Sequence, residues 1–164
     1  DGAAAVADGF EAPLFGARVV GQVTTLPLEG EDGPLESLII KGVVSDHAGA
    51  WYVTTDDSVL HVSMTGRVRS VATLEDAGLR SIAISPDGSA LFVAGSNQIR
   101  RVEAATGAVT TLAGSGTSGN ADGVGGAAQF YYPCGLALSP DGSALFVADR
   151  GDHENHKIRR VEVA

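Results

Sequence analysis

Residues 82–93 read Ile-Ala-Ile-Ser-Pro-Asp-Gly-Ser-Ala-Leu-Phe-Val, and residues 136–147 repeat this phrase as Leu-Ala-Leu-Ser-Pro-Asp-Gly-Ser-Ala-Leu-Phe-Val, 54 positions later. The phrase Ile-Arg-Arg-Val-Glu follows each copy, at residues 99–103 and 158–162, with five extra residues before the second. A fainter copy at residues 43–53 lies 40 positions upstream of the middle one. Internal repeats of this length indicate a repeat architecture.

Each copy predicts short strands joined by tight turns. Isoleucine or leucine alternates with alanine ahead of each Ser-Pro-Asp-Gly, as in a half-buried strand. In that turn proline presets the backbone and glycine accepts a positive φ, so we expect Asp87 and Asp141 to be structural turn residues. The apolar run Leu-Phe-Val-Ala suits a strand that is buried on both faces.

Four strands per repeat predict an all-β fold, a β-propeller of four-stranded antiparallel blades. We expect a divergent blade at residues 37–74, a blade with a Gly-rich inter-blade loop at residues 75–130, and a blade lacking its outer strand at residues 131–164. About three blades are fewer than the four to eight of a ring. The propeller is therefore expected to be partial, or completed by another chain or segment.

Residues 1–36 are not expected to form a blade of their own. The segment 19–26, Val-Val-Gly-Gln-Val-Thr-Thr-Leu, matches Gly-Ala-Val-Thr-Thr-Leu at residues 107–112, where the outer strand of the middle blade is expected. This match predicts an outer strand at 19–26, followed by an acidic loop. Either this strand completes the last blade, or the sequence is cut from a longer array.

The charge balance argues against nucleic acid as a partner. Eleven Lys and Arg residues against twenty Asp and Glu residues give a net charge of −9. Binding to phosphate backbones, or to anionic membrane surfaces, needs clustered basic side chains. The sequence also has no run of about 18–20 apolar residues that could cross a bilayer, so we expect neither nucleic-acid binding nor membrane insertion.

The last two copies resemble the NHL repeat. The motifs that carry this resemblance are Asp-Gly at 122–123, Phe130, Pro133, Gly-Leu-Ala at 135–137, Ala-Asp at 148–149 and Asn-His-Lys-Ile-Arg at 155–159. The resemblance covers residues 75–164 well and residues 37–74 weakly, and the middle copy has Gly95 in place of the aspartate. Ser-Pro-Asp-Gly-Ser-Ala-Leu-Phe-Val is also similar to repeats of lactonase-type propellers.

The resemblance implies two functional classes. The first is a non-catalytic NHL-type propeller segment, an interaction or structural module of a larger extracellular or cell-surface protein or assembly. Its partner would be a protein, including further blades or a second copy, or a glycan. The alternative is a fragment of a propeller enzyme of the metal-dependent lyase or lactonase kind. Such enzymes place metal ligands around the central channel, and the strand openings at 42–43, 80–82 and 135–136 offer none, which favours the non-catalytic class.

The densest polar cluster lies in the last copy. Asp149, Asp152, His153 and Glu154 could together bind Ca²⁺ through oxygen or Zn²⁺ through nitrogen. Against a metal site, Asp149, Asn155 and His156 are ordinary positions of the NHL repeat, where side chains tie a turn by hydrogen bonds. We therefore expect Asn155 and His156 to be structural turn residues, and no cofactor to be required.

Two further residues carry expectations. Asp122, in the Gly-rich stretch 114–126, is expected to cap its turn through backbone N–H groups, because the stretch lacks the Gly-Lys-Ser/Thr ending of a phosphate loop. Cys134 is the single cysteine. It is expected either to be a small buried apolar side chain or to pair with a thiol outside the chain.

Overall fold

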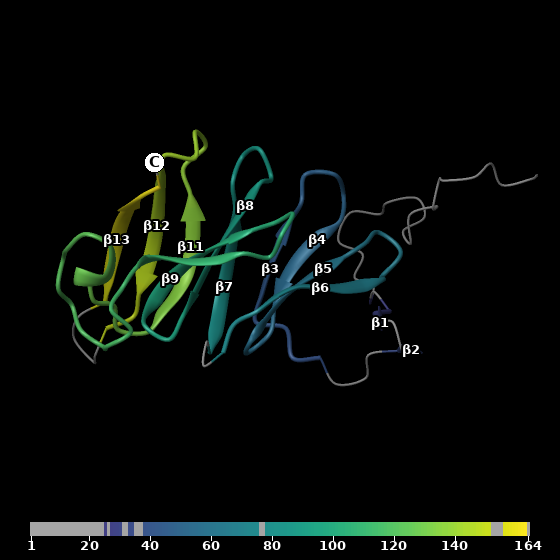
Figure 1. Ribbon diagram of the computed structural model, residues 1–164, viewed down its shortest axis with the longest axis horizontal. Coiled ribbons are helices and arrows are strands. Elements are labelled where there is room, and N and C mark those ends of the chain that lie inside the picture. The colour runs from purple at the N-terminus through teal and green to yellow at the C-terminus, as the bar shows by residue number, and fades with distance from the viewer. Residues whose placement is uncertain are drawn as a thin grey trace, which may run out of the picture.

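Three antiparallel β-sheets stand in a row in the computed structural model of the chain (Figure 1). The structure describes residues 25, 27–30, 33–34, 38–75, 78–151 and 156–163. The strands of the first sheet are β3 (Gly42–Ser45), β4 (Trp51–Thr54), β5 (Ser58–Val62) and β6 (Val68–Thr73). Those of the second are β7 (Leu79–Ile84), β8 (Ala90–Gly95), β9 (Gln98–Glu103) and β10 (Val109–Ala113). The third contains β11 (Pro133–Leu138), β12 (Ala144–Asp149) and β13 (Lys157–Glu162).

Neighbouring sheets meet through their first strands. β7 lies against β3 on one side and β11 on the other, and the backbone N–H of Leu136 donates to Oγ of Ser81 at 3.1 Å. Within each sheet the strands follow one another in chain order away from this first strand. Blades of a propeller are arranged in this way. The prediction of an all-β, propeller-type fold is therefore confirmed.

The Ser-Pro-Asp-Gly phrases form the turns between β7 and β8 and between β11 and β12. Gly88 and Gly142 adopt φ values of 74° and 76° there, a region that glycine enters without steric cost. The backbone N–H of each glycine donates to the carbonyl of the serine three residues before it, at 2.9 Å. The two copies thus fold alike locally.

Apolar side chains fill the two spaces between the sheets. One buried cluster lies between the first and second sheets, and its largest members include Tyr52, Leu79, Leu91 and Val93. A second cluster lies between the second and third sheets and includes Phe92, Ile99, Phe130, Leu145 and Val147. Because both faces of the middle sheet are covered, all six residues of β8 are buried.

The segment before the first sheet is described only in part. Residues 19–24 and 26, which contain most of the predicted outer strand, lie outside the described residues, so that strand remains a prediction. Within the predicted acidic loop, β1 (Glu29–Gly30) pairs with β2 (Gly33–Pro34). Beyond strands, the described chain has one 3₁₀ turn, Gly125–Ala127, and in these residues no helix has the length and apolar character needed to span a bilayer.

The repeated phrase places identical residues in different surroundings. Phe92 in β8 is 0% exposed, whereas Phe146, at the same position of β12, is 41% exposed. Ile99 in β9 is 0% exposed and its counterpart Ile158 in β13 is 74% exposed. The difference arises because the third sheet covers the face that bears Phe92, while no described residue covers the face that bears Phe146.

We expect Phe92→Ala and Phe146→Ala to differ in stability, although they delete the same side chain. Truncating a fully buried phenylalanine costs about 3–5 kcal/mol, since a cavity remains. Phe146→Ala should cost clearly less, because much of its ring already contacts water. Urea unfolding monitored by circular dichroism measures both, and equal losses would contradict the burial described here.

Candidate interaction surface

The outer face of the third sheet has an apolar part that no described residue covers, bordered on β13 by the ion pair of Arg160 and Glu162. Its side chains come from β11, β12 and the start of β13, and alternate with those that face the second sheet. A shallow depression in this face is lined by Gly135, Leu136, Ala137, Phe146, Val147, Ala148 and Ile158. In the second sheet the counterparts of Ala137, Phe146 and Ile158 are buried beneath the third sheet. Exposed apolar patches of this kind mark interaction sites.

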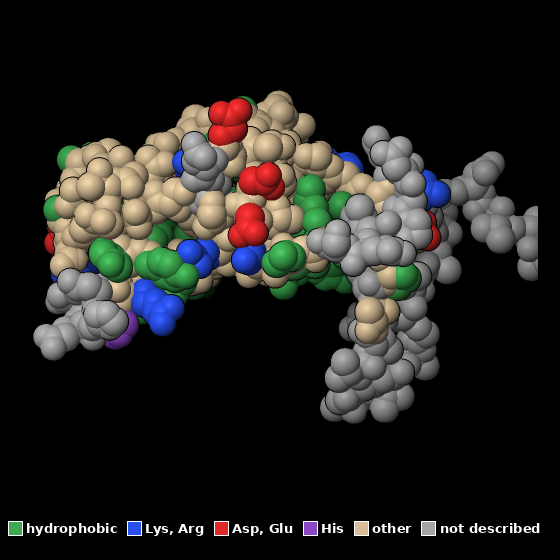
Figure 2. All heavy atoms as spheres, turned by 90° about the horizontal axis from the view of Figure 1, so that it is seen from below, with side chains coloured by type: hydrophobic (Ala, Val, Ile, Leu, Met, Phe, Trp, Pro, Cys, Tyr) green, Lys and Arg blue, Asp and Glu red, His purple; other side chains and the backbone are tan. Residues whose placement is uncertain are grey.

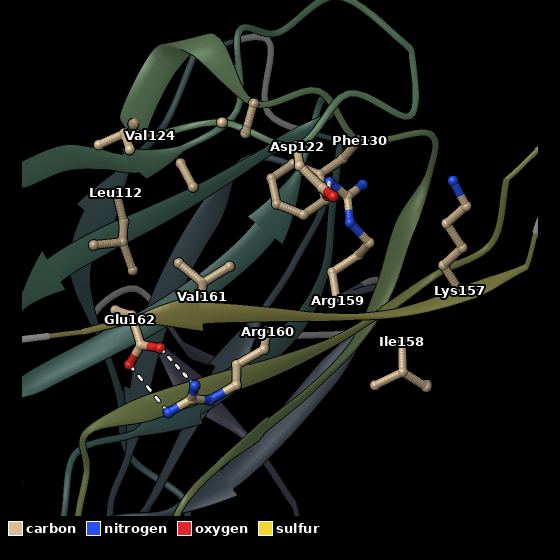
Figure 3. Close-up of a pocket in the computed structure, with 14 residues that line it drawn as sticks. Leu112, Asp122, Val124, Phe130, Lys157, Ile158, Arg159, Arg160, Val161 and Glu162 are labelled. Atoms are coloured by element: carbon tan, nitrogen blue, oxygen red, sulfur yellow. Dashed lines mark hydrogen bonds and ion pairs between the residues drawn. The ribbon is translucent and has the colours of Figure 1, made fainter.

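The outer edge of β13 is also open. The third sheet has the order β11-β12-β13, and the described residues supply no fourth strand, whereas β10 pairs with β9 in the second sheet. A groove of about 860 Å³ follows this edge, and Figure 3 shows β13 along one side of it with Leu112 and Val124 across from the strand. All six residues of β13 line the groove, so it follows the edge of the strand rather than one face.

Arg159 holds the wall of this groove together. The Arg159 guanidinium donates to Oδ2 of Asp149 at 3.2 Å and to Oδ1 of Asp122 at 2.7 Å. It also donates to the carbonyls of Gln129 and Ala121, each at 3.0 Å, and lies 5.1 Å from the centre of the Phe130 ring. Asp149 is 3% exposed, so its charge needs this partner. The arginine thereby fixes the Gly-rich loop to the third sheet.

The second sheet lacks this network because Gly95 stands where Asp149 stands in the third. There Arg100, the counterpart of Arg159, donates to Oε1 of Gln98 at 3.0 Å and 3.2 Å. The register confirms the alignment, since Gly95 pairs with Gln98 and Asp149 pairs with Lys157. The two blades therefore provide equivalent arginines with different hydrogen-bond partners.

The proposed metal ligands are only partly described. Asp152, His153 and Glu154 lie outside the described residues, so the Ca²⁺ or Zn²⁺ site remains a prediction. Both oxygens of Asp149 are engaged, because Oδ1 accepts from the backbone N–H of Tyr131 at 2.8 Å and Oδ2 from Arg159. An adjacent guanidinium disfavours a cation at this carboxylate. Nowhere in the described ranges do three or more His, Cys, Asp or Glu side chains gather as a metal-binding group.

The turn aspartates make dense local hydrogen bonds. Oδ1 of Asp141 accepts from the hydroxyl of Ser139 at 2.6 Å and from the backbone N–H of Ser143 at 3.1 Å, and Asp87 repeats both contacts with Ser85 and Ser89. The hydrogen bond from the serine hydroxyl contributes most to holding the pKa of each aspartate at about 2, below its ordinary 3.8.

Other predicted turn residues differ from this pattern. Asp122 is contacted by Arg159, and its carboxylate is directed at that side chain rather than at a backbone amide (Figure 3). His156 is exposed and directly precedes β13, while Asn155 lies outside the described residues. Sequence reasoning missed Asp46, whose Oδ1 accepts from the backbone N–H groups of Ala48 and Ala50 at 2.9 Å in the first sheet. Asp46 stands where Ser85 stands in the second sheet, since the Oγ of Ser85 accepts from the backbone N–H of Ala90, and the shorter turn of the first sheet concealed this role.

A tyrosine–arginine cluster lies where β7 and β11 begin. The guanidinium of Arg80 is 3.5 Å from the centre of the Tyr132 ring, and that of Arg150 is 5.6 Å away. Tyr132 has a φ of 67°, unusual for a bulky residue, and its backbone N–H donates to Oδ1 of Asn97 at 3.1 Å.

Figure 2 shows acidic, basic and apolar side chains interspersed on the face it draws, without an extended basic area.

Cys134 is exposed, so the expectation of a buried thiol is wrong. It lies near Ala148 and Ile158, on the side of the third sheet that no described residue covers. Its Sγ is 3.6 Å from the carbonyl oxygen of Ala148. The thiol is therefore accessible, and its pairing with a second chain remains a prediction.

Comparison with known proteins places the fold but not the family. No family model and no curated protein sequence matches the chain. A chain in the crystal structure of a nidogen/laminin complex matches with a TM-score of 0.61 and 18% identity, covering 76% of this chain and 44% of that one. Hydrazine synthase from Kuenenia stuttgartiensis matches at 0.57 and 20%, over 75% of this chain and 34% of its own. An auxiliary nutrient-binding protein from Bacteroides ovatus matches at 0.61 and 19%, over 75% and 34%.

These likenesses concern the fold, since all three identities lie below 25%. The chain spans less than half the length of each matched structure. Together with the blade arrangement of the three sheets, they identify a segment of β-propeller type.

We expect the Asp149–Arg159 pair to contribute strongly to stability. Asp149→Ala leaves the arginine almost buried without this partner, which costs about 3–5 kcal/mol for a broken buried pair. The double variant Asp149→Ala with Arg159→Met should lose less than the sum of the single losses, because neither charge then remains. Urea unfolding of the three variants measures the coupling, and strictly additive losses would contradict it.

The turn aspartates should make stability depend on acidity. Because their pKa values are lowered when the chain folds, their contribution is complete above pH 3.8 and is lost as the pH falls towards 2. Ser139→Ala removes the strongest hydrogen bond to Asp141 and should raise its pKa towards 3.8. Carboxyl NMR titration measures this pKa, and an ordinary value in the unaltered protein would refute the assignment.

Proposed function

We propose that this chain is a segment of an NHL-type β-propeller that serves as an interaction or structural module of a larger extracellular or cell-surface protein or assembly. The observation that carries the proposal is the uncovered face of the third sheet, where Phe146 and Ile158 are exposed although their counterparts Phe92 and Ile99 are buried. The equivalent face of the second sheet, which bears Phe92 and Ile99, is buried by the third sheet.

The chemistry of the face favours a protein over a glycan as the partner. Its apolar side chains come from Ala137, Phe146, Ala148 and Ile158, and they offer little for the hydroxyl groups of a sugar to hydrogen-bond. One structural neighbour comes from a complex of two proteins, which is consistent with this class of partner.

The NHL assignment is supported by what its motif residues do. Asp122, Asp149 and Arg159 stand at positions of the repeat motif, and they form one ion-pair network that joins the Gly-rich loop to β13. Phe130, a further motif position, is 1% exposed and lies beneath the guanidinium of Arg159. The motif therefore corresponds to a physical unit, which supports descent of the third sheet from that repeat.

The extracellular or cell-surface setting rests on the resemblance and on charge. The chain is acidic, with a net charge of −9, and is rich in glycine, as in the NHL arrays of large secreted proteins that it resembles. No cofactor forms part of the proposal. Elemental analysis of the purified protein tests this, because Ca²⁺ or Zn²⁺ at one ion per chain would favour the metal-dependent lyase or lactonase alternative.

We expect the purified chain to associate in a concentration-dependent manner through the face that bears Phe146. Burying a phenylalanine side chain contributes about 1.5–3 kcal/mol, so Phe146→Ser should weaken association at least about tenfold. Met64→Ser is the matched control, because Met64 is similarly exposed at a turn of the first sheet. Sedimentation velocity measures both. A chain that stays monomeric at every concentration would contradict the proposal.

A further inference from the structure

The pairing of β9 with β10 provides a template, within the same chain, for what could occupy the free edge of β13. β9 and β13 share the sequence Ile-Arg-Arg-Val-Glu, and the outer edge of β9 is occupied by β10. In that ladder Val109 pairs with Val102, Thr110 with Arg101 and Thr111 with Arg100. A strand that resembles β10 is therefore the natural occupant of the edge of β13.

The chain contains a second copy of the β10 sequence. Val-Thr-Thr-Leu occurs at residues 109–112 and again at residues 23–26. A glycine stands two residues before each copy, at Gly107 and at Gly21.

We propose that residues 19–26 of a second copy of this chain add to β13 as its outer strand. The inference rests on the proposed function, since it names the partner of the third sheet. The template gives the register: Val23 pairs with Val161, Thr24 with Arg160 and Thr25 with Arg159. The ladder stops at Leu26, because Pro27 has no N–H to donate.

The glycine supports this register independently. Gly107 has a φ of 72°, and a Cβ on it would overlap the carbonyl oxygen of Val71 in β6, the outer strand of the neighbouring first sheet. The counterpart of Val71 in the second sheet is Leu112, since each is the residue left unpaired at the bulge of its ladder. Leu112 lines the groove beside β13. A strand placed there in the proposed register would bring Gly21 to Leu112, where only glycine fits.

The connection to the first sheet also agrees with the template. β10 is followed by 19 residues before β11, and the third sheet then covers the face that bears Phe92 and Ile99. Residue 26 is followed by 15 residues before β3. Adding residues 19–26 to β13 would thus bring the first sheet of the same copy over Phe146 and Ile158. That sheet has a matching exposed apolar residue. Val43 pairs with Val53 as Ile82 pairs with Val93, but Val43 is 62% exposed whereas Ile82 is 5% exposed.

The exchange is reciprocal between two copies. Each copy would give one strand and receive one, as in a two-fold symmetric, domain-swapped dimer. The dimer would contain six blades, three from each copy, within the range of closed propellers.

Disulfide trapping tests the strand and its register. In a Cys134→Ser background, one tagged copy carries Val23→Cys and a differently tagged copy carries Val161→Cys. We expect a mixed disulfide under mild oxidation, because directly opposed residues lie within reach of such a bond. Glu162→Cys in place of Val161→Cys is the control, since its side chain faces the other side of the sheet. No mixed disulfide, or equal yields from both pairs, would overturn the inference.

The glycine provides a second measurement. Gly21→Ala should weaken association at least about tenfold, whereas Gly9→Ala, outside the matching segment, should leave it unchanged. An unaltered chain that remains monomeric would overturn both the proposed function and the inference. Association that depends on Phe146 but is insensitive to Gly21→Ala, with no trapped disulfide, would overturn the inference alone.

Discussion

Burial of a sheet face by another sheet determines the rest of this structure. A single four-stranded sheet cannot bury its apolar faces alone, so each blade depends on a neighbour. The middle sheet has a neighbour on both sides, and β8 is buried along its whole length. The two outer sheets have one neighbour each among the described residues, and their free faces expose Val43 on one side and Phe146 with Ile158 on the other.

The hydrogen bonds and ion pairs differ between blades that share the same packing of sheets. Arg159 is almost buried and ties together a loop, a strand end and an aromatic ring, which allows Asp149 to be buried as an ion pair. In the middle blade the equivalent arginine, Arg100, donates to the amide oxygen of Gln98 instead of to a carboxylate. Because the network lies along the groove beside β13, it also keeps the free edge of that strand in place.

The sequence was sufficient to predict the sheets and their turns, because both depend on short-range patterns such as Ser-Pro-Asp-Gly and the alternation before it. It could not distinguish Phe92 from Phe146, since identical residues in identical phrases differ only in what lies opposite them. The contact of Arg159 with Asp122 joins residues 37 positions apart. The exposure of Cys134 likewise follows from a missing neighbour, which no local pattern records.

The complete burial of β8 has a consequence for how the molecule opens. Exchange of backbone amides with solvent follows the free energy of the opening that exposes them, and the last to exchange are those that need global unfolding. The amides of β8 belong to this group, whereas the outer edge of β13 has no partner strand among the described residues. Loss of either end sheet would remove half of the cover of β8. We therefore expect removal of either end sheet to speed amide exchange in β8, at the centre of the chain.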